Sequence, residues 1–299
     1  MGSKLLKRLL LAAGVLLLLA VAVAVAGWLM ADRKMARRVD VAIAPLTLPT
    51  DAAALERGRY LFHSRGCAEC HGADGGGRKV IDAGGMLVVA PNLTPAGVTA
   101  RYGVEDWVRA IRHGLKPDGR PLIIMPSEDY NRFTDADTAA LVAHAKQLPA
   151  VTPGERTVIQ LPPPVRVLYG LGLIKDAAAK IDHGLAPSAP VPEGVTVEHG
   201  RYVAQMCVGC HGEGFGGGKV PGGPPDWPAA ANLTPGKGSA MPRYANADAF
   251  VAMMKSGKRP DGAAIAVMPF QSLAQMSDVD LRGLHAYLVT LPARDFGAR

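Results

Sequence analysis

The four cysteines of the chain lie in two copies of one short motif. Each copy is a Cys-x-x-Cys-His string, formed by Cys67, Cys70 and His71 in the first and by Cys207, Cys210 and His211 in the second. Two thiols at this spacing can each bond one vinyl group of a haem, and the next residue places an imidazole beneath the iron. Disulfides, a redox dithiol or half a zinc site use similar cysteine pairs, but none of them explains a histidine after both pairs. The motifs therefore predict two covalently attached haem c groups, with His71 and His211 as iron ligands.

The sixth ligand of each iron must come from elsewhere in the chain. The soft thioether of methionine is the usual partner of histidine in electron-carrying haems, where it raises the potential. Met125 and Met268 both precede a proline and both follow a Pro-Asp-Gly turn. Met241, which also precedes a proline, is the best rival in the second half, and His63 or His113 would allow a bis-histidine site in the first. None of these rivals recurs in the other half, so we predict Met125 and Met268 as the ligands.

A glycine-rich loop follows each motif, at residues 75–77 and 216–218. The second loop and Lys219 resemble a phosphate-binding loop, but Val220 stands where that loop requires Ser or Thr, and no strand precedes it. Because glycine lets the backbone pass close to a flat cofactor, we expect both loops to lie against haem. Further candidates for the haem pocket or for binding propionates are Asn92, Asn232, Trp107 and Arg120.

These motifs belong to a longer internal repeat. Segments 56–60, 67–72, 92–95, 117–119 and 125–126 recur as segments 198–202, 207–212, 232–235, 260–262 and 268–269, at offsets of 140 to 143 residues. Self-similarity of this kind indicates repeated structural units. We predict two tandem domains, at residues 50–150 and 196–292, joined by a Pro-rich linker at residues 151–195.

Each domain is expected to contain helices joined by long loops. The expected helices cover 53–64, 104–113 and 134–148 in the first domain and 197–206, 246–255 and 277–291 in the second. The last helix of each begins like a capping box, Thr134-x-x-Asp137 and Ser277-x-x-Asp280, with Asp in place of Glu or Gln. No segment alternates convincingly as a strand does, so the predicted fold class is all-α.

The linker contains a possible short helix within residues 165–181, where Leu168, Leu171, Leu173 and Ile174 are concentrated. Prolines on both sides favour extended chain at the ends of the linker. We expect this helix to pack between the two domains. A helix that docks a partner or lies on the membrane surface is the alternative.

Residues 1–38 are predicted to form a membrane anchor with basic flanks. Residues 9–31 are an uninterrupted run of 23 uncharged residues, and about 20 apolar residues are enough for a transmembrane helix. A cleaved signal peptide is the alternative, since Ala-Val-Ala at 24–26 resembles a cleavage site. Residues 1–38 hold seven basic residues and one acidic residue, which leaves only one unit of the +7 net charge elsewhere. The net positive charge therefore lies almost entirely in the anchor. Without a basic surface on the remaining residues, a nucleic-acid partner is excluded.

Taken together, these motifs resemble class I c-type cytochrome domains in tandem. The ordered pattern of Gly-Arg-Tyr, Cys-x-x-Cys-His-Gly, Asn-Leu-Thr-Pro, Pro-Asp-Gly and Met-Pro is similar to the cytochrome c subunits of bacterial membrane-bound alcohol and gluconate dehydrogenases. The resemblance covers about residues 50–292. It implies electron transfer from a periplasmic dehydrogenase to quinone, a terminal oxidase or a soluble carrier. That family typically has three haem domains and no amino-terminal span, whereas this sequence shows two units preceded by an apolar run.

The predicted function is that of a dihaem cytochrome c that relays single electrons and is not an enzyme. We expect it in the bacterial inner membrane, with a single N-terminal span and the haem domains in the periplasm. The expected redox partners are a dehydrogenase or quinol-oxidising complex and a terminal oxidase, soluble cytochrome or cupredoxin. The alternative function is a dihaem cytochrome c peroxidase, which also carries two such motifs but needs an open iron site.

Overall fold

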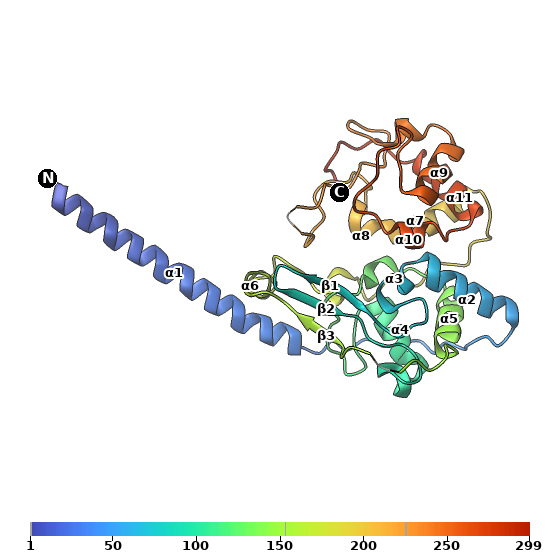
Figure 1. Cartoon of the computed structure of the whole chain (residues 1–299), viewed down its shortest axis with the longest axis horizontal. Coiled ribbons are helices and arrows are strands. Elements are labelled where there is room, and N and C mark those ends of the chain that lie inside the picture. The colour runs from blue at the N-terminus through green and yellow to red at the C-terminus, as the bar shows by residue number, and fades with distance from the viewer. Residues whose placement is uncertain (1, 153, 225) are drawn as a thin grey trace.

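The computed structural model describes residues 2–152, 154–224 and 226–299 and shows a long helix leading to two stacked lobes (Figure 1). The helices are α1 (Gly2–Ala36), α2 (Ala52–Ser64), α3 (Cys67–His71), α4 (Val104–His113), α5 (Asp135–Lys146), α6 (Pro163–Gly170), α7 (Val197–Ala204), α8 (Val208–His211), α9 (Ala247–Ser256), α10 (Phe270–Leu273) and α11 (Asp278–Leu288). Short 3₁₀ turns are η1 (Val98–Arg101), η2 (Ser127–Asp129), η3 (Ala178–Lys180), η4 (Gln205–Cys207) and η5 (Met241–Tyr244). The predicted helical class is confirmed.

The first and last helices of each lobe cross at a glycine. A Cβ on Gly58 of α2 would lie 2.0 Å from the carbonyl oxygen of Ala140 in α5. At the same place in the second lobe, a Cβ on Gly200 of α7 would lie 1.8 Å from the carbonyl oxygen of Gly283 in α11. Any side chain would force these helix pairs apart, so the repeated Gly-Arg-Tyr segment starts with the residue that allows close packing.

The helix ends follow the capping residues in the sequence. Helices α4 and α9 end at Gly114 and Gly257, whose φ angles are +62° and +70°. Such left-handed C-caps are the reason glycine is favoured there. Thr134 and Ser277 accept hydrogen bonds from the backbone N–H groups three residues on, at the starts of α5 and α11.

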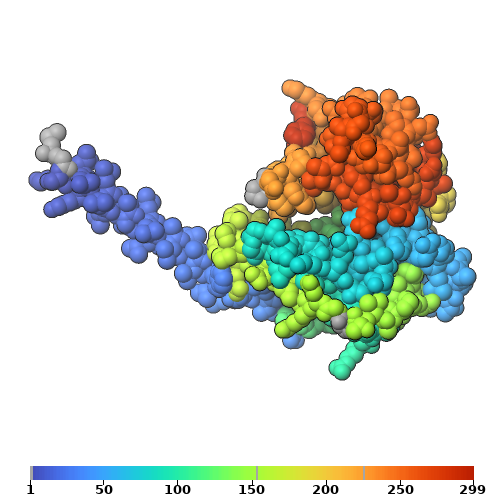
Figure 2. Space-filling view, in the orientation of Figure 1, coloured from blue at the N-terminus to red at the C-terminus, as the bar shows by residue number. Residues whose placement is uncertain are grey.

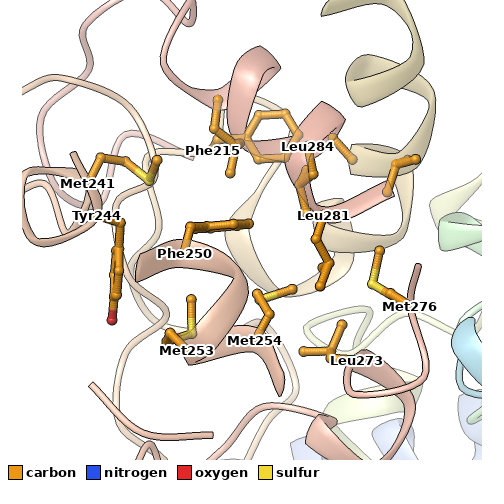
Figure 3. Packing of buried hydrophobic residues seen from close by; sticks show 13 residues of the cluster. Phe215, Met241, Tyr244, Phe250, Met253, Met254, Leu273, Met276, Leu281 and Leu284 are labelled. Atoms are coloured by element: carbon orange, nitrogen blue, oxygen red, sulfur yellow. The ribbon is translucent and has the colours of Figure 1, made fainter. Parts of the chain in front are cut away.

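Each lobe has its own buried core. The first core gathers residues such as Leu61, Trp107 and Val142, and Met125 packs at its edge. The second core is shown in Figure 3, where Met241 lies close to Tyr244 and Phe250. Its methionines are largely buried, as expected for flexible side chains that fill irregular gaps.

A small antiparallel sheet in the first lobe was not predicted. Strands β1 (Lys79–Ala83) and β2 (Met86–Val89) form a hairpin, and β3 (Val158–Gln160) from the linker pairs with β2. Gly84 and Gly85, both at positive φ, make the two-residue turn that favours such a hairpin. With three to five residues each, the strands are too short for alternation to be recognised.

The linker helix does not pack between the lobes, so that expectation is wrong. Helix α6 packs instead against the C-terminal part of α1, and Figure 2 shows the yellow-green atoms of this segment against the blue helix. It is also shorter than expected, because it ends at Gly170. Among the described residues, α1 is the helix long and apolar enough to cross a membrane, with a mean hydropathy of 3.0 in its most apolar window.

Candidate haem-binding sites

Both Cys-x-x-Cys-His motifs form tight helical turns. Residues 67–71 are helix α3, whereas the second motif runs from the end of η4 through α8. Each turn ends at a glycine of positive φ, Gly72 at +84° and Gly212 at +82°. All four cysteines are unpaired, so the disulfide alternative finds no support in the structure. Burial raises the pKa of Cys67 and of Cys207 to about 12.

Both histidines are held in the form that binds iron. The Nδ1 atom of His71 lies 2.9 Å from the carbonyl oxygen of Pro91, and Nδ1 of His211 lies 2.8 Å from that of Ala231. A carbonyl can only accept, so Nδ1 carries the proton and Nε2 keeps its lone pair. Burial lowers the pKa of both imidazoles, which keeps them neutral. This orientation by a backbone carbonyl is the usual support for a metal-binding histidine, so the residues fit an axial haem ligand.

The repeated Asn-Leu-Thr-Pro segment positions those carbonyl groups. Asn92 directly follows Pro91, and its Oδ1 accepts hydrogen bonds from the backbone and hydroxyl of Thr94 at 2.8 and 2.7 Å. Asn232 and Thr234 repeat this arrangement at 2.9 and 2.8 Å. The Nδ2 groups of the two asparagines, considered above as haem-pocket residues, donate to the carbonyl oxygens of Val151 and Arg294. The asparagines are therefore fully engaged with the protein and hold the acceptor of the histidine in place.

The glycine-rich loops pack against the same carbonyl-bearing segments. A Cβ on Gly77 would lie 2.6 Å from the carbonyl oxygen of Ala90, and one on Gly217 would lie 2.3 Å from that of Ala230. Both glycines have positive φ and donate to the carbonyl of His71 or His211. Close backbone approach explains the glycines without any phosphate.

The two predicted methionine ligands lie in equivalent backbone settings. Pro126 and Pro269, which follow Met125 and Met268, have nearly the same conformation, with φ of −81° and −76° and ψ of 61° in both. Each methionine is half-buried at the edge of its own core. Met241, in contrast, starts the turn η5 and is only 7% exposed. The assignment of Met125 and Met268 stays a prediction, with the repeated geometry in its favour.

The buried indole of Trp107 is suited to donate a hydrogen bond to a haem propionate. Its side chain is 5% exposed, and its indole Nε1 has no hydrogen-bond partner among the residues that the structure describes. A buried N–H group normally has an acceptor, and a haem propionate would supply one. Arg120, the other propionate candidate in the first lobe, is instead paired with Asp118 at 2.6 Å on the surface. His113, the rival iron ligand, lies 3.2 Å from His183, nitrogen to nitrogen.

The two lobes are joined by reciprocal tyrosine contacts that were not predicted. The hydroxyl of Tyr60 accepts from the backbone N–H of Ser277 at 2.9 Å and donates to Asp280 at 2.6 Å. Tyr202 makes the matching contacts with Thr134 and Asp137, at 3.3 and 2.6 Å. The N3 aspartates do not reach back to their own N-cap, as Glu or Gln would in a capping box. A tyrosine from the other lobe bridges the two groups instead.

Arg65 adds a buried ion pair to this interface. Its guanidinium lies 2.5 Å from Asp280, and the two side chains are 2% and 0% exposed. His199 contacts the other carboxylate oxygen at 2.7 Å. Burial alone would raise the pKa of Asp280, but the charge of Arg65, with hydrogen bonds from Tyr60, Arg65 and His199, lowers it to about 2. Asp280 is thus a buried anion with several partners.

The haem motifs themselves face this interface. Glu69, inside the first motif, accepts from the backbone N–H of Ser272 at 2.7 Å, four residues after Met268. Asp129, four residues after Met125, accepts from the backbone N–H of Gly209 inside the second motif at 2.9 Å. Each motif therefore contacts the segment that follows the predicted methionine ligand of the other lobe.

Asp129 is expected to make the stability of this contact depend on pH. Burial, together with the nearby Glu128, raises its pKa to about 8, although the N–H of Gly209 and the charge of Lys180 oppose the rise. A carboxyl group that is harder to ionise when folded stabilises most at low pH. The contribution of Asp129 to the free energy of unfolding should therefore fall as the pH rises from about 4 to about 8. Urea denaturation of the parent protein and of an Asp129 variant at each pH would measure this contribution as a difference.

The matched variants for this test are Asp129→Asn and Asp248→Asn. Asp129→Asn should remove this contribution from the pH dependence, because the amide does not titrate. Asp248 is 80% exposed and pairs with Arg282. The Asp248→Asn variant should therefore keep the pH dependence of the parent protein. An Asp129→Asn profile identical to that of the parent protein would contradict the expectation.

Two covalent-attachment turns, each with a carbonyl-supported histidine, on a tandem helical fold define a c-type cytochrome with two haem c groups. A family model described as cytochrome c oxidase, cbb3-type, subunit III matches residues 53–144 and 197–288. The chain belongs to this family. It is an electron-transfer cytochrome.

Curated relatives agree with this class. The fructose dehydrogenase cytochrome subunit of Gluconobacter japonicus is 29% identical over 288 residues, covering 83% of this chain and 55% of that protein. The gluconate 2-dehydrogenase cytochrome c subunit of Pantoea cypripedii is 26% identical, covering 81% of this chain and 60% of that protein. A dihaem cytochrome c-type protein of Cereibacter sphaeroides is 28% identical, covering 79% and 86%. The chain thus spans little more than half the length of the two dehydrogenase subunits.

The interface is what reasoning from the sequence missed. The repeated tyrosines at 60 and 202 and the unusual aspartates at 137 and 280 were all visible as repeats. Their pairing across lobes was not, because it joins residues 65 and 220 positions apart.

Proposed function

We propose that the chain relays single electrons as the cytochrome subunit of a membrane-bound dehydrogenase complex. The observation that carries this proposal is the pair of supported histidines in two tandem domains, in a chain similar in sequence to such subunits. Electrons would arrive from a dehydrogenase or a quinol-oxidising partner and leave to a terminal oxidase or a soluble carrier. Helix α1 would anchor the chain in the bacterial inner membrane, with both haem domains in the periplasm.

The ligand assignments give each residue a distinct role. His71 and Met125 would hold the iron of the first haem, and His211 and Met268 that of the second. When bound, each haem supplies an iron that changes oxidation state by one electron. The protein contributes by keeping each imidazole neutral and oriented, and by filling the remaining position with a thioether that favours the reduced iron. Six ligands would leave no position for a substrate.

Optical and EPR spectra of the purified holoprotein test this function. We expect two low-spin haems, neither of which becomes high-spin on reduction or on addition of calcium. The dihaem peroxidase considered from the sequence receives no support from the comparisons, and it requires a high-spin haem that reacts with peroxide. Detection of such a haem would overturn the relay function.

Partner and topology need separate measurements. Purification in mild detergent should recover the cytochrome together with a dehydrogenase activity, whereas recovery of the cytochrome alone would contradict a stable complex. In spheroplasts, external protease should digest the haem domains and leave Lys4, Lys7 and Arg8 protected. Protection of the haem domains would reverse the proposed orientation. This test is needed because the basic residues at 33, 34, 37 and 38 follow the span on its proposed periplasmic side, whereas basic residues usually lie on the cytoplasmic side.

A further inference from the structure

We infer that helix α6 and the three residues after it form a foot that rests on the outer surface of the lipid bilayer. This α6 foot comprises residues 163–173, and its occupant is lipid rather than another protein. The inference depends on the membrane span proposed above for α1. It goes further by assigning a second membrane contact, which would fix the orientation of the haem domains.

The foot is attached directly to the end of the proposed span. A Cβ on Gly170 would lie 1.7 Å from the carbonyl oxygen of Gly27, and one on Gly27 would lie 2.8 Å from the side chain of Val167. Gly27 is buried and Ala31 has no exposed surface. The two helices therefore meet backbone to backbone at small residues, which leaves little room for movement between them.

This contact lies at the level where a bilayer core would end. The apolar run starts at residue 9, and about 20 residues at 1.5 Å each span the ~30 Å hydrocarbon core, which places its far boundary near residue 28. Trp28 is 38% exposed at this height, and tryptophan is enriched where lipid tails meet headgroups. Helix α6, which packs beside Gly27 and Ala31, must lie at the same height.

The α6 foot carries apolar side chains that no other part of the protein covers fully. Leu168 and Leu171 are each 38% exposed, and Leu173 is 71% exposed. Tyr169 and Gly170, between them, are buried. A cluster of exposed leucines beside a membrane-spanning helix is explained by lipid contact, since lipid tails would cover it without a partner protein.

Polar contacts hold the foot in this position. Arg37 makes two hydrogen bonds with Asp176, at 2.6 and 2.7 Å, and Lys34 donates to the carbonyl oxygen of Tyr169 at 3.2 Å. Arg166 pairs with Asp32 and lies over the ring of Trp28, 4.0 Å from its centroid. Together with Arg33 and Arg38 nearby in sequence, these cations suit the headgroup layer, where they would meet lipid phosphates.

The test measures protection of single cysteines in the full-length holoprotein. Haem attachment uses all four native cysteines, so an introduced cysteine is the sole free thiol. Leu173→Cys reports on the foot, Leu17→Cys on the span and Val289→Cys on an exposed site of the second lobe. Leu17 and Val289 are 65% and 48% exposed in the chain. The variants are placed in nanodiscs of phosphatidylethanolamine and phosphatidylglycerol and treated with a membrane-impermeant maleimide, with labelling read by mass spectrometry.

Leu173→Cys should react at least about tenfold more slowly than Val289→Cys, and Leu17→Cys should also be protected. Because position 173 is more exposed than position 289 in the chain alone, protein packing does not account for such protection. Protection at 17 with rapid labelling at 173 would overturn the foot and leave the anchor intact; this is also the result expected if a partner protein covers the leucines. Rapid labelling at both positions would overturn the span and the foot together.

Discussion

Replacement of Met268 by alanine is expected to lower the midpoint potential of one haem by on the order of hundreds of millivolts, within the ~0.8 V range that axial ligands control. The thioether stabilises reduced iron, and its loss opens the sixth position to added ligands such as cyanide or imidazole. Met125→Ala should have the same effect on the other haem. Potentiometric titration of each variant, followed by ligand titration of the oxidised protein, measures both effects.

Met241→Ala is the matched control for this prediction. Met241 is the other Met-Pro residue of the second lobe and is buried in its core, beside Tyr244 and Phe250 (Figure 3). We expect it to cost about 2–5 kcal/mol of stability, as other core truncations do. Both haems should remain low-spin and closed to added ligands. Loss of a ligand signal in Met241→Ala, with Met268→Ala unaffected, would reverse the assignment in the second domain.

Replacement of Arg65 by methionine is expected to destabilise the protein by about 3–5 kcal/mol, because it leaves the carboxylate of Asp280 buried without its cation. Arg65 and Asp280 are 2% and 0% exposed, and they belong to different lobes. Tyr60 and His199 would remain as hydrogen-bond partners of Asp280, but neither carries a fixed positive charge. Urea denaturation followed by haem absorbance and by circular dichroism measures the loss. We also expect two transitions in each signal instead of one, because the lobes would unfold separately.

Arg59→Met, in helix α2 just before Arg65, provides the control. Arg59 and Glu56 form an ion pair at 2.5 Å, but their side chains are 56% and 60% exposed. Exposed pairs contribute about 0–1 kcal/mol, so this variant should be close to the parent protein. An equal cost for Arg59→Met and Arg65→Met would contradict a special role for the buried pair. A single transition in Arg65→Met would show that the other contacts between the lobes hold them together without the ion pair.

Features that depend on neighbouring residues were predictable from the sequence. The thiols and histidine of each motif and the N-caps at Thr134 and Ser277 all act within a few positions. The repeat then extended each local pattern to a second domain. Two haem c groups on a helical tandem fold were therefore correctly predicted, and the fold class was confirmed by the family match.

Other features depend on pairs of residues far apart in the chain. Tyr60 and Asp280 are 220 positions apart, and Arg37 and Asp176 are 139 apart. The third strand of the sheet comes from the N-terminal end of the linker, where extended chain is expected but its pairing with β2 is not, and α6 packs on α1 rather than between the lobes.

The physical reason for this division lies in how each interaction is specified. A covalent attachment turn or a helix cap needs only residues that the chain already holds close together, so its residues identify it wherever it occurs. A tyrosine hydroxyl or an exposed leucine suits many surroundings, and its role depends on which surface folding brings against it. The chemistry of the haem sites was thus predictable from the sequence. The contact between the lobes and the packing of α6 on α1 depend on distant segments that come together only in the folded protein.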